Sequence, residues 1–82
     1  MATTEKKVFS TLDIYLSAFL ALHGISPKLE IHNGRVTFNF VASDELYEKA
    51  LDYNSNSPVP VASFVTSVKA LRGQMLTMRD KR

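Results

Sequence analysis

Hydrophobic and polar residues alternate most regularly between Lys28 and Phe40, on both sides of the dipeptide Asn33-Gly34. Strict alternation predicts half-buried β-strands, and Asn-Gly between two such runs is typical of a two-residue hairpin turn. A turn of this length places Leu29 opposite Phe38, and the same register sorts the side chains by polarity. One face of the hairpin receives Leu29, Ile31, Val36, Phe38 and Phe40, and the other receives Lys28, Glu30, His32, Arg35, Thr37 and Asn39.

The chain before the hairpin predicts a short strand and then a very apolar helix. Lys7–Phe9 is β-prone, and the hydroxyl of Ser10 or Thr11 can cap a helix that has Asp13 in its first turn. The helix is expected to run to about His23, before a glycine in the left-handed conformation. Apolar residues occupy most of its circumference, so it must be covered on more than one side.

Two further helices are expected after the hairpin. Ser43 is a good N-cap for the first, which has two carboxylates in its opening turn and ends near Asn54. A polar loop follows, and the neighbouring prolines favour an extended Val59–Val61. From Val61 onward apolar residues recur at helical spacing, which predicts a last helix of three turns or more. Gly73 either ends this helix or weakens it.

The predicted order is therefore strand, helix, strand, strand, helix, helix. Because the hairpin has one apolar face, the expected fold class is α+β, a small antiparallel sheet of about three strands with two or three helices packed on that face. The first strand would join an edge of the hairpin. We expect a single domain over residues 1–82, with an ordered core over about 7–73 and flexible ends at 1–6 and about 77–82.

Composition narrows the possible classes of protein. A chain of 82 residues buries only about 60% of its unfolded surface, so any exposed apolar face is a candidate oligomer contact. There is no cysteine, which excludes disulfides and thiolate metal sites. The first seven residues are polar, and the longest nearly apolar run, Ile14–Leu22, is too short to cross a membrane. We therefore expect a cytoplasmic protein with no membrane partner.

Charge is unevenly distributed, although the net charge is only +2. Between residues 42 and 54 four carboxylates stand against one lysine, and from residue 55 onward five cations stand against one carboxylate. The two segments complement each other within one chain or between chains. In the alternative they are solvated faces, because exposed ion pairs contribute little to stability.

The layout resembles a small bacterial family catalogued only as a domain of unknown function. The matching residues are Val8–Thr11 leading into Leu12–Leu20, a hairpin that ends with Val36–Phe40, an acidic helix with Leu46 and Tyr53, and a last amphipathic helix. The resemblance covers roughly Val8 to Leu71. It implies an α+β arrangement and a bacterial or phage origin, and it implies no catalytic residue, cofactor or substrate.

Residues that carry chemistry are few and scattered. The two histidines, His23 and His32, are not at the i, i+4 spacing of a helical metal site, and no cysteine can complete one. Serines and threonines lie at helix starts rather than in a glycine-flanked elbow, and a domain of this size has little interior for a ligand pocket. We therefore expect no enzyme, no cofactor, no metal and no small-molecule substrate.

The polar hairpin face is one candidate binding surface, for nucleic acid. Its candidate residues are Lys28, His32, Arg35 and Asn39. Proteins that read single strands with a sheet stack bases on exposed aromatic rings, but the alternation sends Phe38 and Phe40 to the buried face. Binding would therefore rest on phosphate contacts and weaken quickly with salt. The alternative is a solvated sheet face.

A protein partner or a second copy of the chain is the other candidate. The apolar residues of the first and last helices exceed what one three-stranded sheet can cover, and methionines suit adaptable contact surfaces. The candidate interface residues are Leu20, Phe64, Val68, Met75 and Leu76. In the alternative these residues complete the monomer core. The sequence thus predicts a non-enzymatic binding module that acts through protein interaction or self-association, with nucleic acid as the second possibility.

Overall fold

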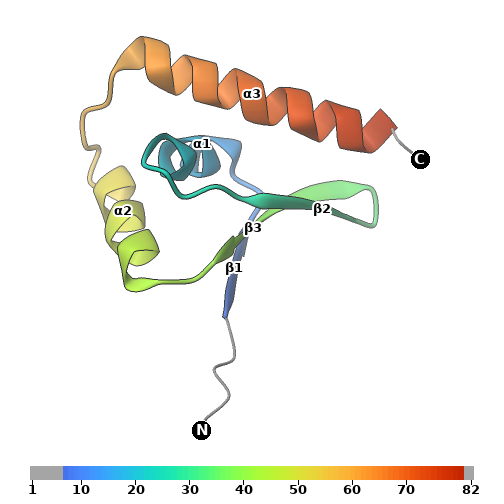
Figure 1. The fold of residues 1–82 in the computed structure, drawn as a ribbon, viewed down its shortest axis with the longest axis horizontal. Coiled ribbons are helices and arrows are strands. Elements are labelled where there is room, and N and C mark those ends of the chain that lie inside the picture. Colours follow the sequence, from blue (N-terminus) through green and yellow to red (C-terminus); the bar gives the residue numbers. More distant parts are fainter. Residues whose placement is uncertain (1–6, 81–82) are drawn as a thin grey trace, which may run out of the picture.

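The computed structural model describes residues 7–80 of the chain. Its elements are β1 (Val8–Thr11), α1 (Ile14–Leu22), β2 (Lys28–His32), β3 (Arg35–Val41), α2 (Asp44–Asn54) and α3 (Val61–Asp80). The strands form one antiparallel sheet in the order β1-β3-β2, and α1 packs against both α2 and α3 (Figure 1). The predicted α+β class and element order are confirmed. Of the flexible ends expected at residues 1–6 and about 77–82, residues 1–6 and 81–82 lie outside the described residues, whereas residues 77–80 belong to α3.

The hairpin has the register that its alternation predicts. Leu29 pairs with Phe38 and His32 with Arg35, and the turn residues Asn33 and Gly34 have φ angles of 52° and 80°. Both φ values are left-handed, as a type I′ turn requires. Phe38 is fully buried, so the aromatic residues of β3 belong to the core and the opposite face of the sheet stays open.

The start of α1 differs from the prediction. Ser10 and Thr11 belong to β1, where they pair with β3, and Asp13 is the N-cap. Its carboxylate accepts hydrogen bonds from the backbone N–H groups of Tyr15 and Leu16, at 2.9 and 3.2 Å. The expected serine or threonine cap is wrong because strand pairing holds those residues in extended conformation.

The core surrounds α1. Four consecutive residues of this helix, Ser17 to Leu20, are buried, so the helix is covered on all sides at this turn. The buried core cluster consists of Ala18, Leu20, Phe38, Phe40, Leu46, Val68 and Leu71. The molecule is nevertheless flat, at 42 × 35 × 17 Å. Its radius of gyration of 13.6 Å exceeds the value of about 12 Å expected for a compact domain of this length.

The last two helices begin and end partly as expected. Ser43 caps α2 by accepting from the backbone N–H of Leu46 at 3.1 Å. Val61 is the first residue of α3 rather than the end of an extended segment, and α3 continues through Gly73 to Asp80. A mid-helix glycine costs only about 1 kcal/mol relative to alanine, and the later turns of α3 gain contacts because Met75 packs against the core.

Candidate interaction surfaces

Much of the apolar surface of this chain is not covered by the fold. Among residues 7–80, nine hydrophobic residues are buried in the core, whereas ten large hydrophobic residues are exposed. Single exposed hydrophobic residues are normal in soluble proteins, so the informative feature is whether these ten gather. Several of them do, on α3 and on α2.

One side of α3 carries an exposed stripe that we call the α3 flank. It consists of Val61, Val65, Arg72, Leu76 and Arg79. The spacings of four, seven, four and three residues place these side chains along one side of a helix. The buried side of α3 carries a different set, with Phe64, Val68 and Leu71 facing the core. The α3 flank therefore adds apolar and basic surface that the monomer does not use.

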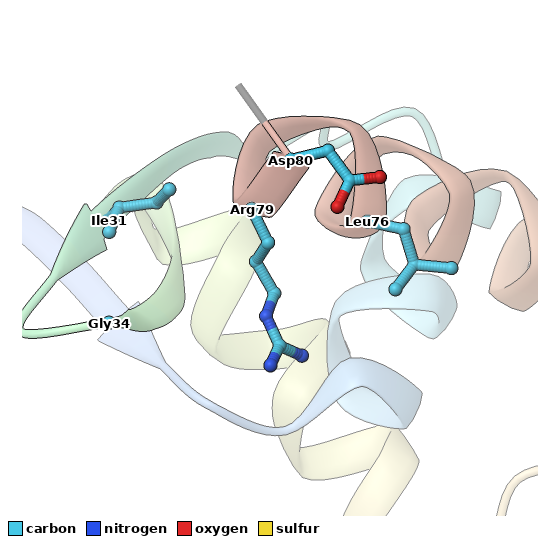
Figure 2. Close-up of a pocket in the computed structure, with 5 residues that line it drawn as sticks. All are labelled: Ile31, Gly34, Leu76, Arg79 and Asp80. Atoms are coloured by element: carbon cyan, nitrogen blue, oxygen red, sulfur yellow. The ribbon is translucent and has the colours of Figure 1, made fainter. Parts of the chain in front are cut away.

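The α3 flank ends in a hollow between α3 and the tip of the hairpin. This hollow of about 400 Å³ is lined by Ile31, Gly34, Leu76, Arg79 and Asp80. Figure 2 shows Leu76 and Arg79 extending from the same side of α3, with the guanidinium group of Arg79 reaching into the space beside the hairpin.

A second hollow, of about 300 Å³, adjoins the first, with which it shares Gly34 and Arg79. It is also lined by Leu12, Arg35, Val36 and Met75. The hairpin tip, the end of α3 and the segment before α1 thus border one open groove, which is lined by apolar residues, two arginines and Asp80.

The five residues predicted as a protein interface lie in different environments. Leu20 and Val68 belong to the buried core, and Phe64 and Met75 are half-buried and pack against it. Leu76 is the exposed member of the set, on the α3 flank. Helical spacing alone identified the apolar residues of α1 and α3 but could not separate the buried side of α3 from the side next to it.

The four residues predicted as a nucleic-acid face do lie on one surface, the open sheet face. Lys28, His32 and Arg35 are exposed there and Asn39 is half-buried. Three of them, Lys28, His32 and Asn39, line a shallow hollow of about 530 Å³, together with residues of β1. The register pairs His32 with Arg35 beside the turn and Lys28 with Asn39 at the other end of the hairpin, so the four residues form two separate cross-strand pairs.

Charges on the open sheet face are mixed. Nε2 of His32 lies 3.7 Å from the Glu30 carboxylate. The Ser10 hydroxyl donates a 2.6 Å hydrogen bond to Oδ1 of Asn39, so that this amide already has one partner. The apolar end of the face is formed by Val8 and Val41, which pair across β1 and β3. Among residues 7–80, the face therefore offers two separate cations and a carboxylate, and Phe40, which lines its hollow, is only 1% exposed.

Sequence reasoning missed a second exposed stripe, on α2. On this helix Leu51 is 66% exposed and Tyr47 49% exposed, although both are large hydrophobic residues. The core instead receives Leu46, because α1 covers only one side of α2. The exposed stripe is Asp44, Tyr47, Glu48 and Leu51. Its i, i+3, i+4, i+7 spacing is the sequence signal that could have identified it.

A fourth hollow, lined largely by aromatic residues, lies where α1 meets the end of α2. Phe19 is central, with ring centroids 5.5 Å from Tyr53 and 4.5 Å from His23. Burial raises the pKa of the Tyr53 hydroxyl above its usual value, and the carboxylate of Asp13 adds to this rise. Both effects favour the protonated form of the hydroxyl.

Within residues 7–80, histidine, aspartate and glutamate side chains form no group of three that could hold a metal ion. No helix in that part of the chain has the length and apolar character needed to cross a membrane. The cytoplasmic location expected from the sequence stays a prediction.

Comparison with known families finds a match over most of the chain. The model of a domain of unknown function, DUF5659, matches residues 6–77, which is most of the chain. The chain belongs to the DUF5659 family. This match confirms the resemblance noted in the sequence. In this DUF5659 protein, the matched residues include the turns of α3 that carry Arg72 and Leu76. No curated protein and no solved structure matches it.

Proposed function

We propose that this DUF5659 chain is a non-enzymatic interaction module that binds another protein chain through the α3 flank. The observation that carries the proposal is the exposure of Val61, Val65 and Leu76 on a side of α3 that lies next to its buried side. Exposed apolar side chains that share one surface mark protein contact sites, and on the flank Arg72 lies between Val65 and Leu76.

The chemistry of the α3 flank suits a protein partner. Arg72 and Arg79 border its apolar residues, and arginine is enriched at protein interfaces because its planar group forms several hydrogen bonds at once. The adjoining groove adds Leu12 and Ile31, which are both exposed. A partner that covered the flank and groove would bury apolar surface that the monomer leaves in water.

Photocrosslinking in cells of the organism that encodes the chain tests this proposal. A photoreactive phenylalanine analogue would replace Val65 on the flank and, as the matched control, Thr66, which is exposed on another side of the same helix. We expect protein adducts from position 65 and few from position 66. Equal yields at the two positions, or no protein adduct from position 65, would contradict the proposal.

Nucleic-acid binding by the open sheet face is the second candidate function. It is favoured by the shared hollow that Lys28, His32 and Asn39 line. Amide chemical shifts would be followed while a mixed-sequence oligonucleotide is added at low and then at high salt. Shifts that cluster on Lys28 and Arg35 and disappear at high salt would support it, because phosphate contacts depend strongly on ionic strength. Unchanged shifts at low salt would exclude it.

A further inference from the structure

The two exposed stripes of this chain have opposite charge and similar apolar content. The α2 stripe contains Asp44 and Glu48 beside Tyr47 and Leu51. The α3 flank contains Arg72 and Arg79 beside Val61, Val65 and Leu76. Each stripe therefore has the composition that the other would need in a binding partner.

The two stripes are not paired within one chain. Between residues 7 and 80 the ion pairs are Glu30 with His32 and Lys49 with Asp52, and neither joins α2 to α3. Figure 1 shows the reason, since α1 lies between the two helices and contacts both. The complementary charges can meet only if α2 and α3 come from different copies.

We infer that the partner of the α3 flank is the α2 stripe of a second copy of this chain. The inference rests on the proposed function and names the partner. Glu48 and Arg72 are the central charges of their stripes, so they face each other when the stripes align, with Tyr47 and Leu51 of one copy against Val65 and Leu76 of the other.

The dimensions of the helices agree with this pairing. With 20 residues α3 is about 30 Å long, and with 11 residues α2 is about 16 Å long. The shorter helix therefore fits along the flank between Val65 and Arg79. Pairing also thickens a molecule that is only 17 Å deep along its shortest axis.

Sedimentation velocity over a range of protein concentrations tests the pairing with matched charge reversals. Glu48→Lys and Arg72→Glu alter the two stripes, while Glu30→Lys and Lys28→Glu make the same charge changes on β2. We expect the wild-type chain to associate as concentration rises. Each stripe variant should associate at least about tenfold more weakly, because like charges then oppose each other, whereas the β2 variants should resemble the wild type.

Mixing gives the decisive measurement. An equimolar mixture of Glu48→Lys and Arg72→Glu restores opposite charges across the contact, so we expect it to associate more strongly than either variant alone. This gain cannot come from a variant that fails to fold. Failure of the mixture to regain association, or equal weakening by the β2 variants, would overturn the pairing.

The test also separates this inference from the proposed function. A wild-type chain that stays monomeric at every concentration overturns self-association. In that case adducts between position 65 and a different protein would still support the interaction module. Wild-type association that none of the four reversals weakens would place the contact elsewhere and overturn the α2–α3 pairing alone.

Discussion

The Ser67 hydroxyl on α3 donates a 3.0 Å hydrogen bond to the backbone carbonyl of Ala18, in the middle of α1. Ala18 is fully buried, and the next residue towards the N-terminus, Ser17, is also buried and donates to the carbonyl of Asp13. Small side chains allow two helix backbones to approach closely. The contact between α1 and α3 is therefore set by residue size as well as by apolar burial.

Substitutions at Ser67 test the close approach of the two helices. Ser67→Ala should lower the free energy of unfolding by about 1 kcal/mol through the lost hydrogen bond. Ser67→Leu should cost about 1–3 kcal/mol, because the larger side chain must push the helices apart. Urea unfolding checks both, with Thr66→Ala on the exposed surface as the control. A leucine variant as stable as the wild type would mean that α1 and α3 are not closely packed here.

Gly73 tests whether α3 continues as one helix to Asp80. A Cβ atom at this position would meet no other atom within 4 Å. Gly73→Ala should therefore raise the free energy of unfolding by about 0.5–1 kcal/mol, since alanine loses less backbone entropy in a helix interior. Thermal unfolding measures the change. No gain in stability would indicate that the helix is broken or frayed at residue 73.

Gly34 should respond in the opposite direction to the same substitution. Its φ of +80° lies in the left-handed region, where a side chain is strained even though the surrounding space is open. Gly34→Ala should lower the free energy of unfolding by about 1–2 kcal/mol. The two glycines are mutual controls, because each substitution adds one methyl group in open space. Equal effects at both positions would contradict the hairpin turn described here.

The parts of the fold that the sequence predicts well are those where two local signals agree. At the hairpin, turn chemistry and alternation both specify which way Phe38 points. At the start of α1, by contrast, Ser10, Thr11 and Asp13 are all good capping residues. Only pairing of β1 with β3, a contact distant in sequence, selects Asp13.

The candidate surface was harder to predict for a related reason. Periodicity shows which residues of a helix share a side, but not how wide a side its neighbours cover. On α2, Leu46 is buried but Leu51 is exposed, and this difference depends on where α1 lies. An apolar residue next to a buried one is thus equally compatible with core and with interface until the packing is known.

Substitutions at the start of α1 test whether Asp13, rather than Ser10 or Thr11, is the N-cap of this helix. Asp13→Ala should lower the free energy of unfolding by about 1 kcal/mol, because two backbone N–H groups at the start of α1 lose their acceptor. Ser10→Ala removes one of the two hydroxyls that were expected to cap, together with the hydrogen bond to Asn39, and should cost less than Asp13→Ala. Asn39→Ala removes the same hydrogen bond and is the control. Chemical denaturation compares the three variants, and a loss for Ser10→Ala larger than the losses for both others would place the cap where the sequence predicted it.

Tyr53 should make the fold sensitive to alkaline pH. Its folded-state pKa is raised above the ordinary value of 10.0, first by burial and then by the Asp13 carboxylate. The unfolded chain therefore loses the Tyr53 hydroxyl proton at a lower pH than the folded chain does. The contribution of the protonated hydroxyl to the free energy of unfolding is complete below pH 10.0 and is lost as pH rises through the folded-state pKa. Tyr53→Phe removes the ionising group. The stability of this variant should decline less than that of the wild type between about pH 9 and about pH 11, the range around the ordinary tyrosine pKa. Denaturation at each pH measures the decline, and the ultraviolet titration difference between wild type and variant gives the Tyr53 midpoint. A midpoint at or below the ordinary value would contradict the burial that we assign to this hydroxyl.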